Sequence, residues 1–280
     1  MAKIFRVNTG DIELNKGIGM HKAKNDLVYW MDADMEVIDK DFFLKLSYPL
    51  QKDPKMFASF TNEFALDKKH PVKNSFLRFI SYDPLQRDPL YQVFSPSIQE
   101  TIIRKGDGYF VCKFVPKRIP PAGRSMYRRL KLLKTDVSKN ESFIDLETLE
   151  IVSRAGHQHF AYVPGAKIRH FHAENINVLI KKRLRNLSRD YLPNLGNKYY
   201  TWFDLKNPKD VIKIISWIIW VNLLIPESIV GLYKSIKFKD LAFLWQPIVS
   251  VVTTDLIIFS ILTSKGGWKL ISSIFGSSNH

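Results

Sequence analysis

Residues 27–34 read LVYWMDAD, in which five apolar side chains are followed by two aspartates that a single alanine separates. A continuous apolar run of this length is typical of a β-strand covered on both faces, as the strands of parallel sheets are. Open α/β sheets bind their ligands beyond the carboxyl ends of their strands. The segment therefore predicts a buried parallel strand that places Asp32 and Asp34 at a ligand-binding edge.

The sequence on both sides of this segment predicts an α/β fold. The expected elements are, in chain order, a strand at 4–7, a helix at 11–25, a helix at 39–50, a strand at 56–60, a helix at 143–156 and extended segments at 160–164 and 167–170. Between residues 65 and 125, Pro84, Pro89 and Pro96 interrupt any long periodic run and indicate loop-rich structure.

The charge balance narrows the possible partners. Forty-two Lys and Arg against twenty-seven Asp and Glu give a net charge of +15, which suits nucleic acid, phosphorylated ligands or an anionic membrane. The chain has no zinc-finger spacing, RNA-binding aromatic signature or P-loop, so we do not expect a nucleic-acid partner.

The single Cys112 excludes an intramolecular disulfide and is interpreted as a packing residue. The opening residues MAKIFRVNTG lack the apolar core of a signal peptide, which favours a cytoplasmic location for the polar part of the chain.

The last third of the chain predicts membrane association. Residues 178–192 combine an apolar stripe with surrounding Lys and Arg, the pattern of a basic amphipathic helix that lies on a membrane face. The candidate membrane spans are 211–233 and 241–263. The apolar core of the first, 211–226, is only about 24 Å long as a helix, against a hydrocarbon core of about 30 Å. The full length to Tyr233 includes Pro226 and Glu227, so we expect either a kinked span or a re-entrant segment.

Asp32 and Asp34 suit a hard divalent cation. Two carboxylates one residue apart repel each other, attract such an ion and offer it only oxygen ligands, which favours Mg²⁺ or Mn²⁺. An ion held there can offset the charge that develops on a leaving diphosphate. An Asp-x-Asp pair alone is common on solvated loops, and here its place directly after an apolar strand gives it weight.

Two blocks of sequence resemble the family 2 glycosyltransferases, which have the GT-A fold. The first block runs from Asn8-x-Gly10 through Asn15-Lys16-Gly17-Ile18 and Ala23 to the LVYWMDAD segment. The second is Ile144-Asp145-Leu146-Glu147, Arg154-Ala155-Gly156, Tyr162-Val163-Pro164-Gly165-Ala166 and His170-Phe171-His172, which is similar to the family's Glu-Asp helix and its Tyr-Val-Pro and His run. The resemblance covers residues 3 to 172.

The resemblance implies an inverting, metal-dependent transfer from a nucleotide-sugar donor to a glycan or lipid-linked acceptor. Asp32, Asp34 and Asn15 would bind the donor, Asp34 and Asp32 with His170 or His172 would hold Mn²⁺ or Mg²⁺, and Asp145 would be the general base. A plain alternative for Asp145 is a charge stabilised by the helix dipole. The Gln-x-x-Arg-Trp run of processive synthases is missing from the basic stretch at 181–189, so a single addition is expected.

The resemblance also implies a domain plan. We expect an incomplete GT-A domain at 1–175, a basic interfacial helix and linker at 176–205, and a helical membrane-anchoring tail at 206–280, with the catalytic part on the cytoplasmic side of the cell membrane. The family's first strands precede the region matched here, so a partner chain that supplies them is a further expectation.

The pattern departs from the family at Ile144, which stands where the family has Glu. Together with the missing first strands, this makes a non-catalytic membrane-bound remnant, or a partner subunit of a split glycosyltransferase, the main alternative. A basic RNA-binding membrane protein is a weaker one.

Overall fold

The structure is a computed structural model of the 280-residue chain. It describes residues 7, 10–64, 72–82, 89–139, 143–188, 192 and 203–275, so the strand expected at 4–7 lies outside the described residues apart from Val7. The chain forms two compact units, which are described one at a time. The first falls within residues 1–33, 37–63 and 96–167, and the second within 34–36, 64–95 and 168–280.

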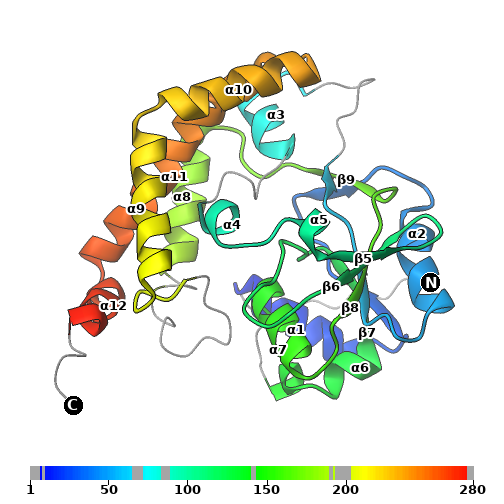
Figure 1. The fold of residues 1–280 in the computed structure, drawn as a ribbon. Coiled ribbons are helices and arrows are strands. Elements are labelled where there is room, and N and C mark those ends of the chain that lie inside the picture. Colours follow the sequence, from blue (N-terminus) through cyan, green and yellow to red (C-terminus); the bar gives the residue numbers. More distant parts are fainter. Residues whose placement is uncertain are drawn as a thin grey trace. The chain divides into compact units, whose positions relative to one another are not determined.

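A six-stranded mixed sheet forms the centre of the first unit (Figure 1). Its strands are β1 (Leu27–Tyr29), β3 (Ala58–Phe60), β5 (Ile102–Lys105), β6 (Phe110–Lys113), β7 (Ser125–Arg128) and β8 (His159–Tyr162). Their order across the sheet is β1-β7-β3-β8-β6-β5. Among these strands β3 and β8 pair in parallel, whereas the other neighbours are antiparallel. The expected α/β class is confirmed, with a mixed sheet.

Apolar side chains at helical spacing anchor α2 (Phe42–Lys52) on this sheet. Phe42, Leu46 and Leu50 recur every four residues, and all three are buried. The helix packs against β3 and β7, and every residue of β3 is buried. The helix expected at 39–50 and the strand expected at 56–60 are thus confirmed as α2 and β3.

The expectation of a buried parallel strand at LVYWM is wrong. β1 has only three residues, each half-buried, and its partner among the described strands is the antiparallel β7. The apolar residues around it serve other contacts. Trp30 has left the strand and packs against Tyr127 and Phe143, with ring centroids 4.8 and 5.3 Å away, while Tyr29 meets Phe42 edge-on at 5.5 Å. Of this apolar run only Trp30 is buried and Met31 is exposed, so the run fixes neither the burial of its side chains nor the pairing of its backbone.

The loop-rich structure expected around Gly106 is also wrong, because that segment is a β-hairpin. β5 and β6 pair antiparallel, and β6 lies inside the sheet between β5 and β8. The turn contains Gly108 at φ +74°, a backbone conformation that glycine adopts without steric cost. Cys112 in β6 is buried and carries a free thiol, as its reading as a packing residue required.

Two helices of this unit carry residues of the candidate site, namely α1 (Ile12–Lys22) and α7 (Asp145–Arg154). Both were expected from the sequence. The Asp11 side chain caps α1 by accepting hydrogen bonds from two backbone amides in its first turn. The backbone N–H of Phe143, just before α7, donates to the carbonyl of Glu13 in α1 over 3.1 Å, which ties the starts of the two helices together. The other helical segments of this unit are α5 (Ile98–Thr101), α6 (Arg129–Leu133) and the 3₁₀ turn η1 (Asp136–Lys139).

The second unit joins a small three-stranded sheet to a group of helices. The sheet has the order β2-β9-β4, with β2 (Met35–Val37), β4 (Glu63–Phe64) and β9 (Lys167–His170). The helices are α3 (Ser75–Tyr82), α4 (Pro89–Val93), α8 (Ile176–Asn186), α9 (Pro208–Asn222), α10 (Ile225–Phe238), the 3₁₀ turn η3 (Leu241–Trp245), α11 (Gln246–Thr263) and α12 (Lys265–Phe275). Within this unit α11 contacts α8, α9, α10 and α12 (Figure 1). Arg78 of α3 also binds Asp240 through two guanidinium nitrogens, at 2.7 and 2.9 Å.

The apolar helices fit the two membrane spans expected from the sequence. Residues Leu241–Thr263 are long and apolar enough to cross a membrane, and α9 and α10 together pass the same test as a pair bent by 70°. The break between them lies at Leu223 and Leu224, just before Pro226, and Leu224 has φ +61°. The bend expected in the first segment is therefore present, and its entry into a membrane stays a prediction.

Candidate functional site

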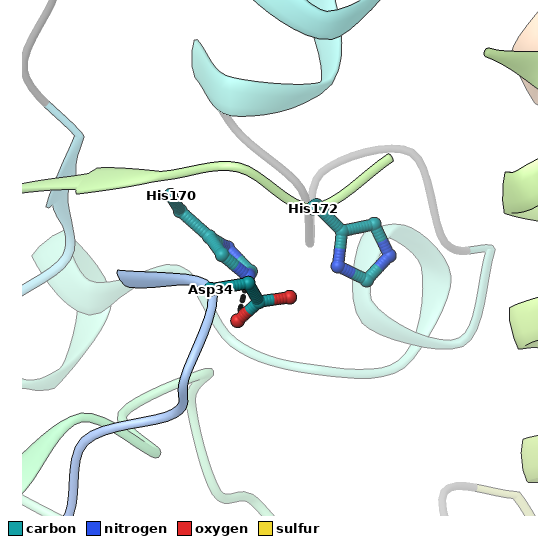
Figure 2. Close-up of side chains that lie close together, drawn as sticks. All are labelled: Asp34, His170 and His172. Carbon is teal, nitrogen blue, oxygen red and sulfur yellow. Dashed lines mark ion pairs between the residues drawn. The ribbon is translucent and has the colours of Figure 1, made fainter. Parts of the chain in front are cut away.

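The chain turns at Asp34 and is held there by β9. Asp34 lies between β1 and β2, and its backbone carbonyl accepts a hydrogen bond of 2.8 Å from the N–H of Phe171, directly after β9. This contact brings the two histidines that flank Phe171 beside the aspartate. One potential ligand atom from each of Asp34, His170 and His172 lies within 4.8 Å of the other two (Figure 2).

The residues of this group fit a divalent metal ion. His170 Nε2 lies 3.3 Å from Asp34 Oδ1. The Nε2 of His172 is buried and has no hydrogen-bond partner within the described part of the chain. Burial lowers the pKa of His172 well below its usual value, with a smaller contribution from the positive charge of Arg183. The ring is therefore neutral at pH 7, the form in which histidine binds metals.

Asp34 stays ionised in this setting. Burial opposes its ionisation, but hydrogen bonds from His170 and Lys182 outweigh that effect and hold the pKa of Asp34 well below its ordinary range. A permanently charged carboxylate beside two imidazoles is a donor set that Mn²⁺, Zn²⁺ and Fe²⁺ accept more readily than Mg²⁺ does. Of the two metals expected from the sequence, these donor atoms suit Mn²⁺ better than Mg²⁺, and the binding of either ion stays a prediction.

Lys182 of α8 is part of the same group. Its Nζ lies 3.0 Å from Asp34 Oδ2 and 2.6 Å from the backbone carbonyl of His172. The sequence pattern placed Lys182 with the residues that face a membrane, whereas the structure turns it onto Asp34. Its neighbour Lys181 is exposed, as the amphipathic pattern requires.

The first unit contains a second cluster, in which three carboxylates surround Lys16. The Lys16 ammonium lies 3.2 Å from Glu13, 3.5 Å from Asp32 and 3.4 Å from Asp145. Glu13 and Lys16 stand one turn apart on α1, Asp32 follows β1, and Asp145 is the first residue of α7. The other carboxylate oxygen of Asp145, Oδ2, lies beside the backbone of Gly123. A Cβ atom at position 123 would lie only 2.5 Å from this oxygen.

The electrostatics of this cluster suit a proton acceptor. Burial raises the pKa of Asp145, and the nearby charge of Asp32 adds to the effect, while Lys16 opposes it. Burial also raises the pKa of Glu13 to about 7, again against the influence of Lys16. A carboxylate whose pKa is moved toward neutrality takes up a proton more readily than a solvated one does.

The sequence predictions for individual residues have different outcomes. Asp34 and His170 lie together as expected, and His172, the alternative ligand, joins them. Asp32 pairs with Lys16 in the first unit and is not among the grouped metal-binding side chains of the described residues, so its role as a metal ligand stays a prediction. Asn15 lies on α1, half-buried, one residue before Lys16, and its role in donor binding stays a prediction.

Sequence reasoning missed four residues of these clusters. The signal for Glu13 and Lys16 was present, because an acidic and a basic residue three apart share a helix face. No local pattern pointed to Gly123 or Lys182, since each reaches its aspartate only through the fold.

Comparison with known protein families and with curated proteins finds no match to this chain. The resemblance to glycosyltransferases therefore rests on the two sequence blocks alone, and the chemistry of the site has to be judged from its own residues.

Proposed function

We propose that this protein is a membrane-associated, metal-dependent, inverting glycosyltransferase of the GT-A type that performs single additions. The observation that carries the proposal is the group of Asp34, His170 and His172, in which the second aspartate of the Asp-x-Asp turn meets two histidines. The raised pKa of Asp145 at the start of α7 supports it, because the same chain then offers a candidate base. These are the residues for which the sequence resemblance implies those roles.

In the proposed reaction a hydroxyl oxygen of the acceptor attacks the anomeric carbon of the donor sugar. The new glycosidic C–O bond forms as the bond from that carbon to the diphosphate oxygen breaks, so the configuration inverts and a nucleoside diphosphate leaves. Asp145 accepts the hydroxyl proton. Lys16 holds the carboxylate of Asp145 in place through its 3.4 Å contact. An ion bound by Asp34 and the two histidines would offset the charge that develops on the leaving diphosphate.

The helical tail supports an acceptor that is presented at a membrane. The residues of Leu241–Thr263 meet the length and composition needed to cross a bilayer. The bent pair α9 and α10 exposes large apolar side chains, among them Ile225, Ile229 and Ile236, and such side chains bind lipid favourably. We propose a lipid-linked or cell-surface glycan as acceptor and the cytoplasmic face of the membrane as the site of transfer.

The test is a transfer assay on the full chain in lipid nanodiscs. A panel of nucleotide sugars is supplied with Mn²⁺ and a membrane extract as acceptor source, and release of nucleoside diphosphate is measured. We expect release with one donor, its loss on adding EDTA, and a loss of at least about 100-fold in Asp145→Asn, as for removal of a general base. Asp34→Ala should fail in the same way.

Asp26→Asn is the matched control, because Asp26 is an exposed carboxylate of the first unit. It should retain wild-type turnover. Release that persists in Asp145→Asn and in EDTA would show that these residues do not carry the chemistry. No release with any donor would favour the non-catalytic subunit.

A further inference from the structure

A lysine binds the carboxylate of the candidate metal group. Lys182 Nζ lies 3.0 Å from Asp34 Oδ2, and His170 engages Oδ1 of the same carboxylate. The ammonium is also hydrogen-bonded to the backbone carbonyl of His172. The one carboxylate of the metal group is therefore already neutralised by a cation from the protein.

The ligand atoms of this group suit a divalent ion, but with Lys182 in place the formal charges leave an ion bound alone with an excess of positive charge. Asp34 contributes one negative charge and the two histidines contribute none as ligands, whereas Lys182 adds one positive charge and the ion two. At separations of a few ångströms and partial burial, like charges repel strongly enough to oppose binding of the ion. A ligand that carries about two negative charges, such as a diphosphate group, would balance the ion and Lys182 together.

We propose that Lys182 is a diphosphate-binding residue that couples the metal to the diphosphate, so that each binds well only in the presence of the other. Without a ligand, the Lys182 ammonium binds the carboxylate of Asp34. With the ion and diphosphate bound together, Asp34 would hold the ion and the Lys182 ammonium would turn to a phosphate oxygen. This inference rests on the proposed function, and it adds a residue that the family resemblance does not supply.

The side chain of Lys182 is suited to such a change. It is 29% exposed, so its ammonium can reach a ligand that arrives from solvent. Lysine is a compact point charge on a flexible stem and binds phosphate without a fixed orientation. The movement from Asp34 to a phosphate oxygen therefore needs only rotations of the side chain and leaves α8 in place.

The test measures binding rather than turnover. Calorimetry on the full chain in nanodiscs gives the affinity for Mn²⁺ alone and for a premixed complex of Mn²⁺ with inorganic diphosphate. For Lys182→Met we expect tighter binding of Mn²⁺ alone, by roughly tenfold, because a competing cation has been removed. We expect weaker binding of the Mn²⁺–diphosphate complex, also by roughly tenfold, the usual loss when a charge-assisted hydrogen bond is removed.

Two further variants isolate the effect of Lys182. Lys181→Met removes the same charge from the neighbouring exposed position and should change neither affinity by more than about twofold. Lys182→Arg should restore binding of the complex, because arginine also binds phosphate.

The possible results separate this inference from the proposed function. Suppose that the wild type binds the Mn²⁺–diphosphate complex. If Lys182→Met then changes both affinities in the same direction, or has the same affinities as Lys181→Met, the inference about Lys182 is wrong and the proposed metal site is unaffected. If the wild type binds Mn²⁺ neither alone nor with diphosphate, the proposed function fails and the inference fails with it.

Discussion

Replacement of Gly123 by alanine should displace the carboxylate of Asp145 and so lower activity, although Asp145 itself is unchanged. A Cβ atom at position 123 would lie 2.5 Å from Asp145 Oδ2, 2.9 Å from its Cβ and 3.0 Å from its Cγ. Contacts below 3.0 Å are essentially never seen for a real Cβ atom. Rotation of the Asp145 side chain can relieve the contact with the carboxylate oxygen but not the one with its Cβ, which moves only with the backbone at the start of α7.

The size of the effect follows from the displacement required. Ordinary van der Waals contact begins at 3.4 Å, so the carboxylate has to retreat by about 1 Å. A misplacement of about 1 Å in a reacting group can lower the rate roughly 100-fold. Overpacking of this kind costs about 1–3 kcal/mol of stability. We therefore expect kcat to fall by about 100-fold in Gly123→Ala, with KM for the donor changed less, because the three atoms nearest to the added Cβ all belong to Asp145 and none to Asp32 or Asn15.

The assay is the transfer reaction described above, together with the thermal unfolding midpoint of each variant. Gly19→Ala is the matched control, since nothing lies within 4 Å of a Cβ atom at that helical position. Alanine should stabilise α1 there by up to about 1 kcal/mol and leave kcat unchanged. A folded Gly123→Ala protein with kcat within twofold of the wild type would refute the placement of Asp145 as the base.

Two other predictions concern buried acids. Burial raises the pKa of Glu13 from 4.5 to about 7, so between those pH values the folded state holds a proton that the unfolded state has released, and stability falls as the pH rises through this window. Glu13→Gln should remove this pH dependence, so the variant should exceed the wild type in free energy of unfolding by at most about 3 kcal/mol at pH 8 and by little at pH 4.5. Unfolding midpoints at the two pH values measure the difference, and a larger gain in stability at pH 4.5 than at pH 8 would contradict the prediction. Glu227 is buried and accepts hydrogen bonds from Trp220 Nε1 (2.9 Å), Gln246 Nε2 (2.7 Å) and Ser250 Oγ (2.7 Å). Glu227→Ala leaves these three donors without an acceptor, so it should lower the free energy of unfolding by at least about 3 kcal/mol and expose the start of α10 to protease. Glu227→Gln should lower it less. Equal protease resistance of Glu227→Ala and the wild type would count against this role of Glu227.

The parts of the fold that the sequence predicts well are those with strong local patterns. α2 follows from Phe42, Leu46 and Leu50, which share one face because they are spaced by four residues. The bend between α9 and α10 follows from Pro226, because proline has no N–H to continue a helix and favours the first turn of a new one. Both features depend only on residues that are neighbours in the chain.

The parts that the sequence predicts poorly depend on distant residues. The pairing of β1 could not be read from its apolar side chains, because β7 lies about a hundred positions later and forms the ladder through its backbone. The β5–β6 hairpin was missed because its strands are four residues each and the glycines between them are equally typical of a loop.

The candidate site divides in the same way. Asp34 and His170 are recognisable because each belongs to a block of several residues with characteristic spacing. Lys182 lies 148 positions from Asp34, and Lys16 lies 129 positions from Asp145. A lysine on a helix face is usually solvated, so no local rule could have assigned either of them to an aspartate.

The two aspartates of the Asp-x-Asp turn contact different side chains. The boundary between the two compact units falls between Ala33 and Asp34, so the single intervening residue separates them into different clusters. Asp32 is bound to the lysine that also holds the candidate base, and its charge helps to raise the pKa of Asp145. Asp34 is bound to histidine and to Lys182, and its own pKa is held low. One carboxylate thus favours a proton on its neighbour while the other stays ionised for a cation. A pair that the sequence presents as two equivalent metal ligands is, in its contacts, one residue of the base cluster and one of the metal group.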